Sequence, residues 1–495
     1  MPSSRSDFDL VPLPDRVHAL PGRFPLRDGT GLRVGPGAEP AAALLAAVTG
    51  LRLPAAKDGP FVLALDPALS GLGEEGYGLT VGPDGAALRA GRLAGLLRGV
   101  QTVRQLLDEE GHLPGTQITD IPRYAWRGAM LDVARHFQPV EYLKRYVDLL
   151  AFHKMNVFHL HLTDDQGWRM PVPAYPLLTE VGGWRTESAG DGRPHGGAYT
   201  KAELLDLVEF ARARGVTVVP EIEMPGHMRS ALAAYPELGN RPEVRLDTWT
   251  EWGVCENILG VQEETLEFCR VVLDEVMDVF PSPYIHIGGD ECPIVEWQES
   301  PRARERAAAL GLDGPEALHG WFMGEMAAHL TARGRKPLGW TETGHDLPGA
   351  FTVAAWRDAA HGLAAARRGQ DVVMTPHLST YLDYRQSDHP EEPAGQPGPV
   401  VDLRAVYETE AVPSDWEPEA AARLLGAQAQ LWTEYAPTAA HIEYLAFPRM
   451  SALAEATWST HRDFAAFSRR MRHHRTRLTA LGVTGRRPAR ETSGA

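Results

Sequence analysis

Cysteine is scarce in this chain, with three among 495 residues: Cys255, Cys269 and Cys292. So low a count argues against a disulfide framework and against a structural zinc site. Cys255 and Cys292 lie on either side of one predicted helix, so a bridge between them is one alternative. Free thiols in a reducing compartment are the simpler interpretation.

Long apolar runs are also missing. No stretch approaches the ~18 apolar residues that a membrane-spanning helix needs. Residues 1–25 also lack the apolar core of about 7 to 15 residues that marks a secretory signal. We therefore expect a cytoplasmic protein without a membrane partner; secretion stays open if the natural chain starts further upstream.

Positive charge is in short supply. The chain has 49 Lys and Arg residues against 65 Asp and Glu residues, a net charge of −16. A field of that sign repels phosphate backbones, so we predict no nucleic-acid partner. One basic run, residues 469–477, is interpreted as a solvated face of the last helix.

What the chain does contain is a regular alternation of short β-like runs and helical patterns from residue 127 onward, which is typical of βα units around a parallel sheet. The predicted strands are residues 127–132, 157–162, 217–222, 284–287, 336–340, 352–355, 371–374 and 426–431. Eight strands close a TIM barrel. We predict an α/β fold: a (β/α)8 TIM barrel over residues 121–495, ending in a C-terminal helix.

Residues 1–120 form a different kind of segment. They are rich in Gly, Pro and Ala, and they contain β-like runs at 61–65 and 77–81 and an amphipathic helix at 93–107. This pattern predicts a smaller N-terminal α+β accessory domain, whose function the sequence does not reveal.

Within the barrel, Thr200 to Glu203 reads as a capping box that opens a helix. The connection 341–351 is too short and too rich in Gly and Pro for a regular helix.

Polar and aromatic residues collect where the predicted strands end, the position of active sites in TIM barrels. They are Asp132, Arg135, Asp164, Asp165, Glu223, His227, Asp290, Glu291, Trp340, Glu342, Trp356, Tyr381, Asp383, Trp432 and Glu434. Carboxylates and an arginine bind hydroxyl groups, and indole faces stack on sugar rings. The set is typical of a carbohydrate-binding site.

Two adjacent carboxylates, Asp290 and Glu291, follow a strand and the glycines 288–289. Such a pair is more often the polar start of a loop, but here it can present an acid and its partner to a bond. A metal site is the other alternative, because His159 and His161 resemble the His-x-His pair of metal-dependent barrel hydrolases, with His227, Asp164 and Asp290 available to complete it. All these positions have roles in a sugar site, so we predict no metal and no cofactor.

Several motifs are shared with a known family. They are RGAMLDVARH at 127–136, HLHLTDDQGWR at 159–169, MPGH at 224–227, HIGGDE at 286–291, GW at 339–340, YLD at 381–383 and LWTE at 431–434. With these motifs in family order from about residue 121 to 460, the chain resembles the β-N-acetylhexosaminidases of glycoside hydrolase family 20. Residues 1–120 resemble the family's accessory domain more weakly.

The resemblance implies a retaining exo-enzyme that removes terminal GlcNAc or GalNAc with the substrate's own 2-acetamido oxygen as nucleophile. It makes Glu291 the general acid and base, Asp290 the partner of the acetamido N–H, and Tyr381 the donor to the acetamido oxygen. The remaining positions would bind the sugar (Arg135, Trp340, Trp356, Asp383, Trp432 and Glu434) or orient the acid from behind (Asp164, Glu223 and His227).

Two positions depart from the family pattern. Glu223 stands where Asp is usual before MPGH, and Thr341 replaces a common acidic residue after Trp340. The expected partners are oligosaccharides or glycoconjugates that end in N-acetylhexosamine. The choice between GlcNAc and GalNAc, the natural substrate and the oligomeric state stay open. A non-catalytic glycan-binding protein and a metal-dependent hydrolase are the competing hypotheses.

Overall fold

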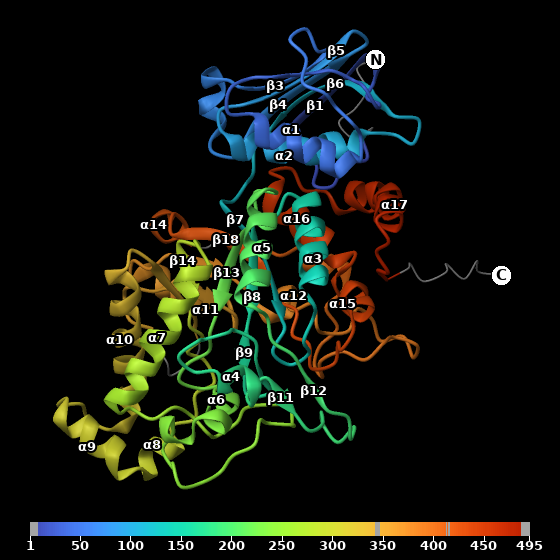
Figure 1. Ribbon diagram of the computed structural model, residues 1–495. Coiled ribbons are helices and arrows are strands. Elements are labelled where there is room, and N and C mark those ends of the chain that lie inside the picture. Colours follow the sequence, from blue (N-terminus) through green and yellow to red (C-terminus); the bar gives the residue numbers. More distant parts are fainter. Residues whose placement is uncertain (1–7, 342–346, 412, 414–415, 487–495) are drawn as a thin grey trace.

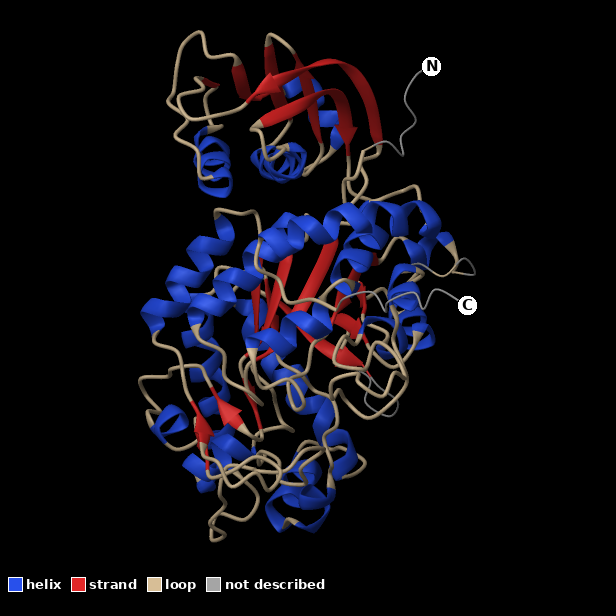
Figure 2. Ribbon diagram, turned by 90° about the vertical axis from the view of Figure 1, so that its right-hand side faces the viewer, coloured by secondary structure: helices blue, strands red, loops and turns tan. Residues whose placement is uncertain are grey.

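The computed structural model describes residues 8–341, 347–411, 413 and 416–486, which form two domains (Figure 1). The N-terminal domain is built on a six-stranded sheet with the order β1-β6-β4-β5-β3-β2. Its strands are β1 (Arg16–Pro25), β2 (Leu32–Val34), β3 (Phe61–Leu65), β4 (Tyr77–Gly82), β5 (Gly85–Ala90) and β6 (His112–Asp120). Helices α1 (Glu39–Thr49) and α2 (Leu93–Leu106) lie along one face of the sheet (Figure 2).

The core of this domain follows directly from its residue pattern. Tyr77, Leu79 and Val81 alternate along β4 and are fully buried, because every second side chain of a strand points to the same face. Leu96 and Val100, four residues apart on α2, are buried in the same cluster. The predicted strands and the amphipathic helix of this domain are therefore confirmed.

The second domain is a closed barrel of eight parallel strands in the order β13-β14-β15-β16-β17-β18-β7-β8. The strands are β7 (Trp126–Asp132), β8 (Val157–His161), β13 (Thr217–Glu221), β14 (Tyr284–His286), β15 (Lys336–Thr341), β16 (Thr352–Ala355), β17 (Val372–Met374) and β18 (Leu424–Ala429). Each predicted barrel strand is present, with its ends displaced by two residues or fewer. The TIM barrel is confirmed.

Helices surround the barrel (Figures 1 and 2). They include α3 (Val140–Phe152), α5 (Lys201–Arg212), α7 (Glu263–Val279), α10 (Leu318–Ala332), α11 (Ala359–Arg367), α15 (Ala439–Ala446), α16 (Arg449–Trp458) and α17 (Phe464–Ala480). The predicted capping box opens α5: the Glu203 N–H donates to Thr200 Oγ1 (3.2 Å), and the Thr200 N–H donates to Glu203 Oε2 (2.7 Å).

The remaining elements lie in the connections and loops. They are β9 (Thr163–Asp164), β10 (Gly167–Trp168), β11 (Trp184–Arg185), β12 (His195–Gly196), α4 (Leu177–Glu180), α6 (Arg229–Ala234), α8 (Val295–Glu299), α9 (Pro301–Ala309), α12 (His377–Thr380), α13 (Leu403–Tyr407), α14 (Pro418–Ala421), and the 3-10 helices η2 (Pro67–Leu72), η3 (Pro236–Leu238) and η4 (Pro315–Ala317). Residues 347–351 between β15 and β16 contain no helix, as expected; residues 342–346 lie outside the described residues.

The basic run in α17 does not form a uniformly solvated face, which corrects the sequence-based interpretation. Arg470 is buried and hydrogen-bonded to Glu455, and its Nε donates to the Leu10 carbonyl (3.1 Å). Arg469 and Arg472 are exposed as expected. A helical pattern alone cannot show that Arg470 meets a carboxylate from α16.

No helix in the described ranges has the length and apolar character to span a membrane.

A buried polar cluster joins the two domains. The Asp120 carboxylate at the end of β6 accepts hydrogen bonds from Lys154 Nζ (2.7 Å), the Tyr77 hydroxyl (2.7 Å) and Trp458 Nε1 (2.9 Å). Lys154 follows α3 and Trp458 ends α16, so one carboxylate ties the accessory domain to two parts of the barrel domain. The accessory domain lies beside the end of the barrel where the strands begin (Figure 1).

Replacing Asp120 with Asn is expected to lower the free energy of unfolding by about 3 to 5 kcal/mol, because the buried Lys154 ammonium would lose its counter-charge. Denaturant unfolding followed by circular dichroism measures the change. Asp28→Asn is the matched control, since Asp28 and Arg52 form an exposed ion pair and its loss should leave stability nearly unchanged. Equal stability of the two variants would contradict a structural role for Asp120.

Candidate active site

A cavity of about 280 Å³ opens at the end of the barrel where the strands finish. It is lined by Arg135, Asp164, Glu223, His227, Asp290, Glu291, Trp356, Arg357, His377, Tyr381, Asp383, Tyr384, Gln396, Trp432 and Glu434. Every residue to which the family resemblance gives a role lines it, except Trp340. A largely polar cavity with a few aromatic side chains fits a sugar better than an apolar ligand.

Four residues of the lining were not foreseen. His377 and Tyr384 flank the predicted Tyr381 and Asp383, and Arg357 follows Trp356, so sequence adjacency could have found them. Gln396 reaches the cavity from a long loop, where its N–H donates to the Asp383 carbonyl (2.9 Å). No sequence signal marks Gln396. Glu342, expected after the fifth strand, lies outside the described residues.

The loop after β14 carries the two adjacent carboxylates on an unusual backbone. Gly288 and Gly289 have φ of 62° and 96°, which glycine adopts without steric cost. A Cβ on Gly288 would lie 1.6 Å from Glu223 Oε2, so a larger residue there would displace the Glu223 carboxyl group. Glu291 itself has φ of 43°, a conformation that costs a non-glycine residue about 1 to 3 kcal/mol and that is concentrated at functional sites.

A chain of acidic and imidazole groups stands behind Glu291. His227 Nε2 lies 3.7 Å from Glu291 Oε2, and His227 Nδ1 donates to Asp164 Oδ1 (3.2 Å). Burial alone would lower the pKa of His227, but the Asp164 and Asp165 carboxylates raise it well above its usual value. His227 is therefore an imidazolium at neutral pH that faces the carboxyl group of Glu291.

Arg135 is bound into the same arrangement. Its Nη2 lies 2.9 Å from Asp164 Oδ2, and its Nε donates to Gln166 Oε1 (2.9 Å). Burial would raise the pKa of Asp164, yet the Arg135 and His227 charges hold it far below its usual range. The guanidinium also lies 5.1 Å from the centre of the Trp432 ring, so it is fixed against one wall of the cavity.

Asp383 and Glu434 occupy the same side of the cavity as Arg135. Both oxygens of the buried Asp383 carboxyl lack a hydrogen-bond partner among the described residues. Burial and the neighbouring Glu434 carboxylate raise the pKa of Asp383 well above its usual value. A buried polar group without a protein partner is costly, so these oxygens are available to hydroxyl groups of a ligand.

Aromatic rings form another part of the lining. Trp356 and Tyr381 stack with centroids 6.3 Å apart and planes inclined by 22°, and Tyr381 lies 6.4 Å from Trp432. Burial and the Asp290 charge raise the pKa of Tyr381 well above its usual value, so its hydroxyl keeps the proton that it can donate. Trp340 is only 1% exposed and lies beneath the cavity, with its ring 6.2 Å from Trp432.

Glu223 lines the cavity as an uncharged carboxyl group. Its Oε2 has no hydrogen-bond partner among the described residues. Burial, together with the Asp290 and Glu221 charges, raises the pKa of Glu223 well above its usual value. Glu223 is thus protonated at neutral pH next to Asp290. The other departure, Thr341, is 2% exposed at the end of β15 and places no charge there.

The candidate metal ligands do not converge on one point. His159 lies 3.0 Å from Glu221 Oε2, whereas His161 Nε2 lies 2.9 Å from Asp164 Oδ2. His227 is grouped with Asp164 and Asp165 on one side and with Asp290 and Glu291 on the other. The five candidate ligands are therefore spread over several small groups of side chains and do not form one set. All three cysteines are buried free thiols, which agrees with the simpler of the two interpretations of the sequence.

Known proteins share the sequence and the fold of this chain. Residues 124–461 match the family described as "Glycosyl hydrolase family 20, catalytic domain", and residues 7–121 match "Glycosyl hydrolase family 20, domain 2". A β-hexosaminidase of Akkermansia muciniphila is 40% identical over 428 residues, covering 83% of this chain and 85% of the relative. A β-hexosaminidase of Porphyromonas gingivalis is 39% identical over 448 residues, covering 87% of this chain and 57% of the relative.

A solved structure resembles the whole chain. The exo-β-N-acetylglucosaminidase of Vibrio harveyi, in complex with N-acetylglucosamine, has a TM-score of 0.88 at 32% identity. The match covers 97% of this chain and 78% of that protein.

Proposed function

Because the chain belongs to glycosyl hydrolase family 20 and is a β-hexosaminidase-type glycoside hydrolase, we propose that it is a retaining exo-enzyme that uses the substrate's acetamido group as its nucleophile. Its substrates would be oligosaccharides or glycoconjugates that end in β-linked N-acetylhexosamine. One observation carries the proposal: Glu291 is backed by His227 and Asp164, while Asp290 and Tyr381 line the same cavity.

In the first step the acetamido carbonyl oxygen attacks C1 of the sugar, and the C1–O bond to the leaving group breaks. Glu291 transfers its proton to the departing oxygen, which leaves as an alcohol. The Asp290 carboxylate accepts a hydrogen bond from the acetamido N–H as positive charge develops on the oxazolinium ring. The Tyr381 hydroxyl donates a hydrogen bond to the acetamido oxygen and so orients it toward C1.

In the second step water attacks C1 from the face that the leaving group vacated. Glu291, now a carboxylate, takes the proton of this water, and the ring opens to restore the acetamido group. Two inversions at C1 give net retention. Trp356 and Trp432 shield the acetamido methyl group, so water does not compete with the intramolecular attack.

Exo-cleavage is supported by the side of the cavity that Arg135, Asp383 and Glu434 form. Their polar groups would bind the 3-, 4- and 6-hydroxyls of the sugar, which are free together only in a terminal residue. The similarity to an exo-β-N-acetylglucosaminidase that was crystallised with N-acetylglucosamine agrees with this assignment.

The proposal predicts turnover of an aryl β-N-acetylglucosaminide and none of the matching aryl β-glucoside, because the glucoside has no acetamido oxygen to attack C1. A thiazoline that mimics the bicyclic intermediate should inhibit strongly. Release of the aryl group is the measurement, with and without a chelator. Equal cleavage of both glycosides would exclude participation of the acetamido group. Binding of chitobiose without hydrolysis would favour a glycan-binding protein, and loss of activity on chelation a metal-dependent hydrolase.

A further inference from the structure

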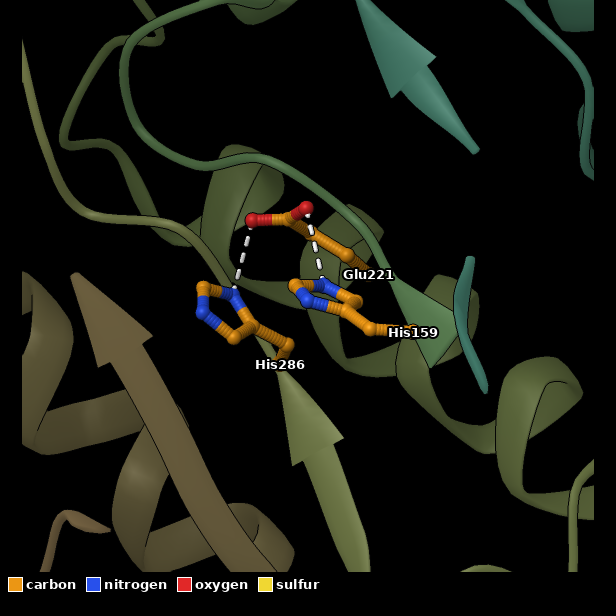
Figure 3. Close-up of side chains that lie close together, drawn as sticks. All are labelled: His159, Glu221 and His286. Carbon is orange, nitrogen blue, oxygen red and sulfur yellow. Dashed lines mark ion pairs between the residues drawn. The ribbon is translucent and has the colours of Figure 1, made fainter. Parts of the chain in front are cut away.

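A fully buried carboxylate, Glu221, stands at the centre of a cluster beneath the cavity. Four side chains from three neighbouring strands approach its two oxygens. His161 Nδ1 and His159 Nε2 from β8 lie 2.5 and 3.0 Å from Oε2. On Oε1, His286 Nδ1 from β14 lies at 2.8 Å and Trp340 Nε1 from β15 donates at 2.7 Å. Figure 3 shows His159 and His286 on the two different oxygens.

Two histidines of the cluster differ in their protonation state. Gln428 Nε2 lies 2.9 Å from His159 Nδ1, and burial lowers the pKa of His159 to about 4, so this ring is neutral. Burial would also lower the pKa of His161, but the Glu221 and Asp164 carboxylates raise it to about 10. His161 is therefore an imidazolium that donates from both nitrogens to carboxylates.

His161 connects the cluster to the groups behind Glu291. Its Nε2 lies 2.9 Å from Asp164 Oδ2, the same carboxylate that binds His227 and Arg135. The resulting sequence of groups runs from Glu221 through His161, Asp164 and His227 to Glu291. Charges alternate in sign from Glu221 to His227, which makes each group the counter-ion of the next.

Glu221 also supports the floor of the cavity. Its Oε1 holds the indole N–H of Trp340, whose ring packs 4.6 Å from His286 and 6.2 Å from Trp432. His161 packs edge-on against Trp432, with centroids 4.9 Å apart. The position of the indole wall thus depends on the same carboxylate.

Packing alone does not account for the cluster. The His159 and His286 rings stack, with centroids 4.7 Å apart and planes inclined by 27°, and each directs a nitrogen at a different oxygen of Glu221. A purely packing role would not require a carboxylate with four polar contacts in a site where burying a charge is costly.

We infer that Glu221 is a positioning residue of this active site: its carboxylate holds His161 against Asp164 and the Trp340 indole beneath the sugar, so that proton transfer by Glu291 and alignment of the acetamido group both depend on it. The inference rests on the proposed function. Glu221 itself lies below the cavity and touches no substrate.

Glu221→Gln tests this role, because it keeps the shape of the side chain and removes its charge. We expect kcat for an aryl N-acetylglucosaminide to fall about 10- to 100-fold, the range seen when a partner behind a directly acting group is removed. KM should change little, and affinity for the thiazoline should fall in parallel with kcat/KM.

The pH profile separates positioning from mere structural support. In the wild-type protein His161 keeps its proton up to a pH of about 10. Without the Glu221 charge the pKa of His161 must fall, so the variant should lose activity as pH rises above about 7, near the ordinary pKa of histidine. A dinitrophenyl substrate, whose leaving group needs no proton, reveals this loss separately from the general acid.

Titratable groups from several elements face His161. They are Asp132 from β7, His159 from β8, Asp164 from β9, Glu221 from β13 and Glu223 from the loop that follows. Glu223 is protonated, and the Asp164 carboxylate is shared with Arg135 and His227. Glu221 differs from Asp164 in this respect, because no arginine or histidine outside the cluster, in the part of the chain that the structure describes, binds its carboxylate.

Two further variants complete the experiment. Glu455→Gln is the matched control: Glu455 is 1% exposed and paired with Arg470 between α16 and α17, so its loss should lower the melting temperature and leave the kinetics unchanged. Glu221→Asp keeps the charge, so the loss above pH 7 should not develop. If Glu221→Gln does not fold, His161→Asn should show the same fall in kcat without a pH-dependent loss.

A folded Glu221→Gln protein with wild-type kcat and pH profile would overturn the inference, and so would an equal loss in Glu455→Gln. Failure of the proposed function has a different signature, since the wild-type protein itself would then not cleave the aryl N-acetylglucosaminide. In that case thiazoline binding tests the role of Glu221. The Glu221→Gln variant is expected to bind the thiazoline at least tenfold more weakly than the wild-type protein, on the order of the loss in kcat given above.

Discussion

Glu291→Gln is expected to lower kcat/KM for a natural disaccharide by about 100- to 10,000-fold, the contribution typical of a general acid. The amide cannot give a proton to the leaving oxygen, and it cannot activate water in the second step. For a dinitrophenyl glycoside, whose leaving group departs without protonation, the first step should be nearly unaffected. Parallel kinetics on the two substrates measure the difference.

The contact between His227 and Glu291 bears on this prediction. His227 Nε2 lies 3.7 Å from Glu291 Oε2 and is an imidazolium, so it can stabilise the carboxylate that forms when Glu291 has given up its proton. Pre-steady-state measurements on the dinitrophenyl substrate should show a burst, because breakdown of the intermediate becomes slow. Equal losses on both substrates would contradict the assignment of Glu291 as the acid.

Asp290→Asn has the second largest expected effect: kcat should fall about 100- to 1,000-fold, as when a group that stabilises developing charge is removed. The Asn side chain keeps the size of Asp290 but carries no negative charge to oppose the positive charge of the oxazolinium ring. Because this charge develops only as the reaction proceeds, KM should change much less than kcat.

Inhibitor binding distinguishes the loss of the Asp290 charge from a change in the shape of the site. Asp290→Asn should bind the thiazoline far more weakly than the wild-type protein, whereas its affinity for the product sugar should be similar, since the product carries no positive charge. A variant with the wild-type rate would sink the assignment of Asp290.

Most of the fold could be predicted from the sequence, because local patterns carry it. Strand β16 (Thr352–Ala355) was predicted to the residue, and β18 (Leu424–Ala429) is displaced by two residues because Leu424 and Leu425 begin the strand before the small residues that follow. The error in α17 has a tertiary cause. Arg470 looks like a surface residue in its helix and is buried only because α16 brings Glu455 next to it.

The cavity could be predicted to a similar extent, since the rule that strand ends form the site of a barrel identified eleven of its lining residues. Trp340 was expected there because it also ends a strand, but its indole turns down to Glu221. Gln396 was missed because it belongs to a loop that no periodicity describes. The proposed role of Glu221 was missed too, since this residue ends a strand, β13, whose sequence looks like ordinary core.

By itself the sequence determined the barrel and the family and predicted the reacting pair, because hydrophobic periodicity and short motifs are local properties of the chain. Only the tertiary structure decided how charge is distributed among these residues. The protonation of His161, His227, Glu223 and Asp383 depends on which buried groups the barrel brings together from different strands. Electrostatic energies at 3 to 4 Å in a buried site far exceed those of exposed groups in water, so these contacts, which no sequence pattern reveals, set the chemistry.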